Sequence, residues 1–118
     1  MIEIADDRGL EEFFKQERAV LFFHAKWSQY AVISKQMVEL VEFYAPGKID
    51  AVFYFGEFEE ERLPLAEALV AAGVPKELAF TGNGSLSFFQ HGKHVCTMTS
   101  VIGEGAWEVW RNLEESFA

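Results

Sequence analysis

Residues 19–36 read AVLFFHAKWSQYAVISKQ, and this stretch decides the fold. It opens with a continuous apolar run, 19–23, which is typical of a central strand covered by helices on both faces. Ser28 follows at the start of a long helical segment, where its hydroxyl can accept a hydrogen bond from a free backbone N–H of the first turn. A buried strand that leads into a long helix indicates an α/β protein whose early strands are joined by helical crossovers.

The remaining elements extend this unit into a mixed sheet. The pattern predicts strands over 2–4, 19–23, 49–55, 86–89 and 95–101, and helices over 6–16, 28–44, 63–72 and 107–117. The last two strands flank the turn residues 90–93 and form a hairpin signal. Crossovers followed by a hairpin and a closing helix predict a central sheet of four to five strands with helices on both faces. The segment 76–84 has no clear period.

Apolar side chains recur at helical spacing in two of these helices. They are Ile33, Met37, Leu40, Val41 and Tyr44 in the first, and Trp107, Trp110, Leu113 and Phe117 in the last. The tryptophan-containing stripe is expected to belong to the core. The acidic run 57–61 is expected to interact with the N-terminus of the helix that follows it, because a calcium loop would need spaced oxygen ligands and a tight Gly turn.

Composition limits the classes of protein to consider. Of 118 residues, half are hydrophobic and a quarter charged, which predicts one globular domain over 1–118. No apolar run approaches the ~20 residues that cross a bilayer, and an acidic N-terminus is unlike a signal peptide, so a soluble, cytoplasmic protein is expected. The net charge of −9 disfavours nucleic acid and anionic membrane surfaces as partners.

The single cysteine, Cys96, excludes an internal disulfide and a multi-cysteine metal site. It lies in a predicted strand, where a lone cysteine usually behaves as a small buried or half-buried hydrophobic residue. Conjugation to glutathione or an intermolecular disulfide is the alternative. His91, His94 and Cys96 have a spacing that could supply metal ligands, but no fourth ligand is apparent, so neither a metal nor a cofactor is expected.

Two sequence fragments at the correct order and separation resemble the thioredoxin family. In that family an apolar strand ends in a pattern like F-W-A-x-W-C-x-x-C-K, and a later hairpin reads like T-L-x-x-F-x-x-G. Here Ala25-x-Trp27 is kept in FFHAKW, residues 22–27, and SLSFFQHG, residues 85–92, fits the second pattern. The resemblance covers nearly the whole chain and implies a thioredoxin-like fold.

The departures from the family pattern concern its reactive groups. The resemblance places the two family cysteines on Ser28 and Ala31, the buried aspartate on Phe22 and a nearby lysine on Phe53. A hydroxyl and a methyl group cannot attack a disulfide, so dithiol–disulfide oxidoreductase activity is not expected. The family's cis-proline falls at about Gly84, where a trans peptide is expected because a non-proline cis bond costs about 2.5–4 kcal/mol.

These observations predict a redox-inactive domain that binds a protein or peptide, as an adaptor, assembly or chaperone-like module. The resemblance implies a groove formed by Trp27, Ser28, Gln29, Tyr30, Gly84 and Ser85, with Phe80 as a further candidate. Two alternatives stay open: Tyr30 packs in the core, or the helix N-terminus binds a small anion. A nucleophilic role of Ser28 is disfavoured because no base is nearby in the sequence. A glutathione- or thiol-linked redox protein that uses Cys96 is the alternative function, and a homo-oligomer that packs through Phe-rich edges is also considered.

Overall fold

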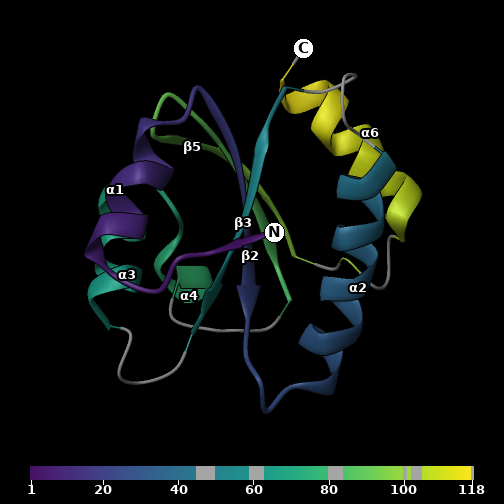
Figure 1. Cartoon of the computed structure of the whole chain (residues 1–118), viewed down its shortest axis with the longest axis horizontal. Helices are drawn as coiled ribbons and strands as arrows, with labels where there is room; N and C mark the ends of the chain where they lie inside the picture. Colours follow the sequence, from purple (N-terminus) through teal and green to yellow (C-terminus); the bar gives the residue numbers. More distant parts are fainter. Residues whose placement is uncertain (45–49, 59–62, 80–83, 100, 102–104, 118) are drawn as a thin grey trace.

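The structure, a computed structural model, describes residues 1–44, 50–58, 63–79, 84–99, 101 and 105–117. Its centre is a five-stranded sheet in the order β1-β3-β2-β4-β5. The strands are β1 (Ile2–Glu3), β2 (Arg18–His24), β3 (Val52–Glu57), β4 (Leu86–Gln90) and β5 (Lys93–Met98). The helices are α1 (Asp7–Lys15), α2 (Gln29–Tyr44), α3 (Leu63–Ala71), α4 (Lys76–Ala79) and α6 (Ala106–Ser116). The α1, α3 and α4 helices cover one face of the sheet, and α2 and α6 cover the other (Figure 1).

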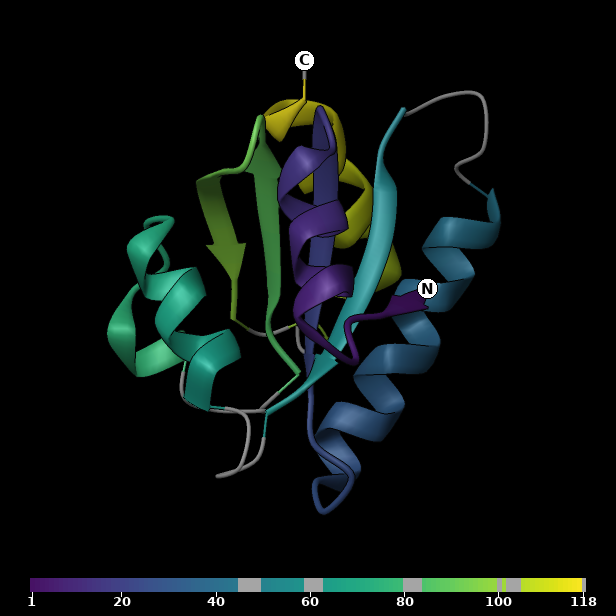
Figure 2. The ribbon, with the colours of Figure 1, turned by 60° about the vertical axis from the view of Figure 1, so that its left-hand side comes forward.

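The sheet is mixed, as the sequence predicts. Strand β3 lies between β1 and β2 and is parallel to both, whereas β4 is antiparallel to β2 and to β5. Since β2 lies between β3 and β4, it is the central strand of the sheet (Figure 2). Its residues alternate between the two layers, so both of its faces are buried.

Each face of the sheet carries its own core. On the side of α1 and α3, the buried cluster includes Phe13, Leu21, Phe23, Tyr54, Leu69 and Phe89. On the side of α2 and α6, it includes Val20, Phe22, Val38, Phe53, Phe88 and Leu113. Burial of large apolar side chains on both sides explains why the 19–23 run has no polar alternation.

Local sequence signals account for several element ends. The carboxylate of Asp6 caps α1 by accepting a 2.8 Å hydrogen bond from the backbone N–H of Gly9. Gly73, with a φ of +112°, follows α3. Between β4 and β5, His91 and Gly92 have φ values of +52° and +75°, which is the left-handed backbone that a two-residue hairpin turn needs.

One prediction about a helix face needs correction, and a second helix buries smaller residues than its apolar spacing suggests. Trp107 is 75% exposed, so its assignment to the core is wrong, and Val109 occupies the buried position of α6 with Leu113. In α2 the buried residues are Ala31, Ser34, Val38 and Val41. Most of the larger apolar residues at helical spacing, among them Ile33, Leu40 and Tyr44, lie on the exposed side.

Several predicted boundaries also shift. Strand β3 extends to Glu57, so this residue belongs to the sheet and not to the acidic run before α3. The short helix α4 was not predicted, and β5 ends at Met98. The Pro46-Gly47 dipeptide, which follows the predicted helix 28–44 and is expected to end it, lies outside the described residues, as do the acids 59–61 and Phe80. Among those that are described, no helix is long and apolar enough to cross a membrane.

Candidate functional site

The turn between β2 and α2 has the geometry of a capped helix start. The Ser28 hydroxyl Oγ accepts a 3.2 Å hydrogen bond from the backbone N–H of Ala31, and the Ser28 carbonyl accepts one from Val32. The predicted N-cap role of Ser28 is therefore confirmed. The methyl group of Ala31, at the second family cysteine position, is fully buried.

The residues around this turn differ in exposure. Trp27 is 74% exposed and Tyr30 is 39% exposed, so simple core packing of Tyr30 does not hold. Gln29 is also exposed, and Ser28 is half-buried. Two large aromatic side chains therefore reach solvent at the start of α2.

Gly84 and Ser85 lie directly beneath this turn. The Gly84 N–H donates to the Phe23 carbonyl and the Phe23 N–H donates to the Ser85 carbonyl, each at 2.9 Å, which joins the segment to the end of β2. A Cβ atom on Gly84 would lie 3.0 Å from Ser34 Oγ and 3.2 Å from Tyr30 Cδ1. Both Gly84 and Ser85 are buried, so they support the turn from below and do not line its surface. No cis peptide bond occurs among the described residues, and the bond before Gly84 involves a residue outside them.

A buried pair of titratable side chains lies beside the turn. His24 and Glu57 are opposite each other at the ends of the parallel strands β2 and β3, and His24 Nε2 lies 3.7 Å from Glu57 Oε1. Their other polar atoms, His24 Nδ1 and Glu57 Oε2, are buried without a hydrogen-bond partner in the described structure. The sequence alone did not predict this pair.

Lys35 of α2 completes this cluster. Its Nζ atom lies 3.9 Å from the centroid of the Phe55 ring, a cation–π contact, and Phe55 is paired with Phe22 in the β2–β3 register. The residue opposite Phe22 is thus Phe55, and Phe53, which the resemblance aligned with a nearby lysine of the family, is opposite Val20. Phe22 and Phe53 are nevertheless both buried in the α2-side core.

Burial governs the charge state of His24. Desolvation lowers the pKa of His24 below the usual histidine value of 6.5, and the nearby Lys35 and Lys26 act in the same direction. The carboxylate of Glu57 raises the pKa of His24, but by less than burial lowers it. At neutral pH the imidazole is therefore uncharged beside the carboxylate.

One sequence signal could have identified this pair. His24 and Glu57 are polar residues that end two apolar strands, and neighbouring parallel strands place their carboxyl ends at the same edge of a sheet. The signal was obscured because Glu57 begins a run of acidic residues that was assigned to a loop.

Cys96 lies apart from the turn, on β5. It is half-buried, and its Sγ atom lies 3.2 Å from Ser116 Oγ on α6. His94 Nε2 lies 2.7 Å from Thr97 Oγ1, and burial lowers the pKa of His94. Within the described ranges, no group of three or more His, Cys, Asp or Glu side chains is arranged to hold a metal ion.

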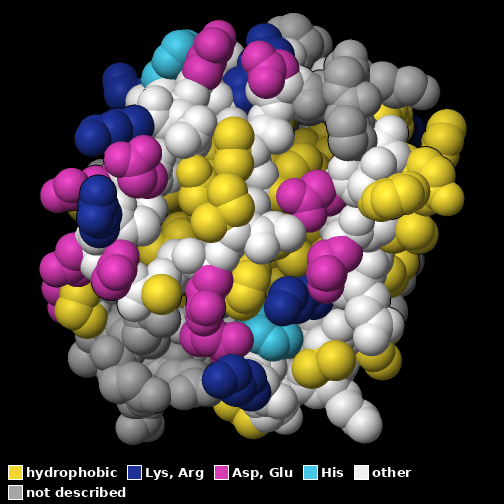
Figure 3. Space-filling model, in the orientation of Figure 1, with side chains coloured by type: hydrophobic (Ala, Val, Ile, Leu, Met, Phe, Trp, Pro, Cys, Tyr) yellow, Lys and Arg dark blue, Asp and Glu magenta, His cyan; other side chains and the backbone are white. Residues whose placement is uncertain are grey.

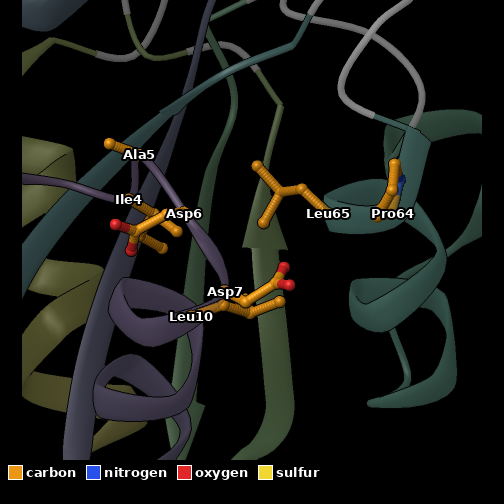
Figure 4. Close-up of a pocket in the computed structure, with 7 residues that line it drawn as sticks. All are labelled: Ile4, Ala5, Asp6, Asp7, Leu10, Pro64 and Leu65. Atoms are coloured by element: carbon orange, nitrogen blue, oxygen red, sulfur yellow. The ribbon is translucent and has the colours of Figure 1, made fainter.

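A separate shallow pocket occurs on the other face of the sheet. It has a volume of about 130 Å³ and is lined by Asp7 and Leu10 of α1, Pro64 and Leu65 of α3, and residues 4–6 (Figure 4). Because α1 and α3 lie on the side of the sheet opposite α2, this pocket is not continuous with the turn at Ser28 (Figure 1).

Comparison with known proteins shows the fold. No family model and no curated protein sequence matches this chain. Among solved structures, the oxidised thioredoxin of Plasmodium falciparum superposes with a TM-score of 0.73 at 13% identity, covering 100% of this chain and 99% of that chain. Thioredoxin from Fasciola hepatica gives 0.67 at 18% identity, covering 98% and 99%. A putative oxidoreductase with a thioredoxin fold gives 0.72 at 11% identity, covering 96% and 92%. The predicted resemblance is confirmed at the level of architecture: the chain has a thioredoxin-like fold and contains a single cysteine.

Proposed function

We propose that this chain is a redox-inactive thioredoxin-like domain that binds a protein or peptide at the start of α2. The binding surface, called here the entry surface, comprises Trp27, Gln29 and Tyr30. The observation that carries the proposal is that Ser28 and Ala31 occupy the turn as a helix cap and a buried methyl, while Trp27 beside them is 74% exposed.

The chemistry of the turn supports binding rather than electron transfer. Disulfide exchange needs a thiolate that forms a mixed disulfide, and neither the Ser28 hydroxyl nor the Ala31 methyl can form one. The Ser28 hydroxyl is also engaged in capping α2. Exposed tryptophan and tyrosine side chains, in contrast, are the residues that most often dominate the energy of protein interfaces.

The position of the aromatic pair also supports this role. Gly84 packs against Tyr30 and Ser34, and the backbone of Gly84 and Ser85 is hydrogen-bonded to β2. The entry surface is therefore held by a central strand of the sheet, and little ordering of the chain is needed when a partner binds. Low ordering cost favours affinity.

A redox assay tests whether the domain lacks oxidoreductase activity. We expect that the purified chain does not accelerate reduction of insulin by dithiothreitol, because it lacks a dithiol at the turn. The Ser28→Cys, Ala31→Cys double variant provides a positive control for the assay. If the unmodified chain reduces insulin and a Cys96→Ala variant does so equally, the proposal is contradicted. If the activity is lost in Cys96→Ala, the domain is redox-active through Cys96.

A binding assay tests the other half of the proposal. Short random peptides displayed on phage are selected on the immobilised chain, and we expect recovered sequences to bind the unmodified protein but not Trp27→Ala. Trp107→Ala is the matched control, because Trp107 on α6 is exposed to the same extent, 75% against 74%. Peptides whose binding is unaffected by Trp27→Ala, or equally lost in Trp107→Ala, would refute the entry surface.

A further inference from the structure

The outward side of α2 consists mainly of uncharged side chains. Seven exposed residues recur along it at steps of one, three and four, which places them on one side of a helix: Gln29, Val32, Ile33, Gln36, Leu40, Phe43 and Tyr44. These residues are called here the outer face of α2. A solvent-facing helix side in a globular protein normally carries charged and polar residues, so this one is unusual.

The exposed areas on this face are large. Phe43 is 74% exposed, Tyr44 65%, Leu40 51% and Ile33 50%. In Figure 3, hydrophobic side chains follow the edge of the molecule where α2 and α6 run in Figure 1, and acidic side chains lie inward of them. Contiguous apolar surface of this kind marks an interaction site.

Two of the three charged residues of α2 are directed away from this face. Lys35 lies over the Phe55 ring, and the Glu42 carboxylate binds the N-terminal ammonium group at 2.8 Å. The third, Glu39, is exposed; at 3.6 residues per turn it lies about 100° around the helix from Leu40 but about 20° from Val32, so it flanks the outer face on one side.

We propose that the outer face of α2 binds the same face of a second copy of this chain, with the two helices antiparallel and Leu40 close to the two-fold axis. Leu40 is the apolar residue nearest the middle of the stripe between Ile33 and Tyr44, which spans about 17 Å at 1.5 Å per residue. With the two-fold axis between Gln36 and Leu40, Ile33 of each copy lies opposite Phe43 of the other, and Val32 lies opposite Tyr44.

Net charge favours a second copy at this face. Each chain carries a formal charge of −9, so two copies repel wherever acidic surfaces meet. The seven residues of the outer face of α2 are uncharged, and Glu39 is the one exposed carboxylate of this helix beside them, which makes this face better suited to self-association than the acidic surfaces. A basic partner, in contrast, would find its complement on the acidic surfaces and not here.

The area is also sufficient. If a large side chain offers roughly 150–250 Å² when fully exposed, the seven residues together offer on the order of 700 Å². A standard interface buries about 800 Å² on each partner. A reversible dimer is the result that this area supports.

Sedimentation of the purified full chain tests the proposal. We expect a concentration-dependent species of twice the 13.4 kDa monomer mass. Leu40→Glu places two carboxylates near the axis and should weaken dimerisation by ~100-fold or more. The control is Val95→Glu. It introduces the same charge at a residue that is 43% exposed on the edge strand β5 and is not part of the outer face of α2.

Two further measurements separate this interface from others. An equimolar mixture of Leu40→Glu and Leu40→Lys should restore the dimer, because opposite charges then meet near the axis. Raising salt from about 0.02 M to about 0.5 M should tighten the unmodified dimer, since it screens the repulsion between acidic chains. A monomer at the highest soluble concentration, a dimer that survives Leu40→Glu or dissociates with Val95→Glu, or a mixture that stays monomeric overturns the proposal. Circular dichroism of each variant confirms that it is folded.

Discussion

His24 Nε2 and Glu57 Oε1 lie 3.7 Å apart at the paired ends of β2 and β3. The thioredoxin resemblance places a buried aspartate on Phe22, two residues before His24 on the same face of the strand. The chain therefore has an aromatic ring at the family's titratable position and a titratable pair one step further along the strand. Because this pair is buried, the stability of the fold depends on pH.

The first prediction concerns acid sensitivity. Burial lowers the pKa of both His24 and His94 below 6.5, so the unfolded chain takes up these protons at a higher pH than the folded chain. The contribution of these two histidines to the free energy of unfolding is therefore fully present above pH 6.5, and it is lost as the pH falls from 6.5 toward their pKa values in the folded state. Each unit of pKa depression corresponds to about 1.4 kcal/mol. Urea denaturation between pH 8 and pH 5 measures this slope, and His24→Gln should flatten it. An unchanged slope in that variant, or an equal effect of the turn variant His91→Asn, would contradict the assignment.

The second prediction isolates the carboxylate. Since Glu57 raises the pKa of His24, Glu57→Gln should lower the His24 pKa further. Glu39→Gln should lower it less, because Glu39 makes the smaller contribution in the same direction. NMR titration of the His24 ring protons measures both. A His24 pKa that rises, or fails to move, in Glu57→Gln would show that the pair does not interact.

The third prediction concerns Gly84. Its φ of +81° is unfavourable for other residues, and an added Cβ would lie 3.0 Å from Ser34 Oγ. We expect Gly84→Ala to lower the free energy of unfolding by about 2–4 kcal/mol through backbone strain and overpacking. In a Gly84→Ala, Ser34→Ala double variant, removal of the hydroxyl should recover part of this loss. Denaturant titration of the four proteins of this cycle gives the coupling, and strictly additive effects would rule out the contact.

The fourth prediction concerns the cap of α2. Ser28→Ala removes the acceptor for the Ala31 N–H and should cost about 1 kcal/mol of unfolding free energy. Ser28→Asp keeps a side-chain acceptor and should retain most of the stability. Thermal unfolding distinguishes the two, and equal losses would mean that the cap contributes nothing.

The architecture was largely readable from the sequence. The unbroken apolar run of β2 identifies a strand with two buried faces, and the His91-Gly92 turn identifies the hairpin. These signals are local, because each depends on the period or backbone preference of a few neighbouring residues. They fix the types of the elements and the mixed character of the sheet.

The faces of α2 were less readable. Small residues, Ala31 and Ser34, occupy the side that packs on the sheet, whereas Ile33 and Leu40 remain outside. Apolar size alone therefore indicated the wrong side. Likewise, His24 and Glu57 are more than thirty residues apart in sequence, and only the parallel register of β2 and β3 brings them together.

The strand order has a consequence for synthesis of the chain. Strand β2 is an internal strand only when β4 pairs with it, and β4 follows β2, α2, β3, α3 and α4 along the chain. While the ribosome is still making α3, one side of the Phe22-Phe23 strand has no neighbour to bond. Such an edge is prone to pair with other chains. The growing polypeptide therefore depends on prompt synthesis of its last third or on protection by chaperones.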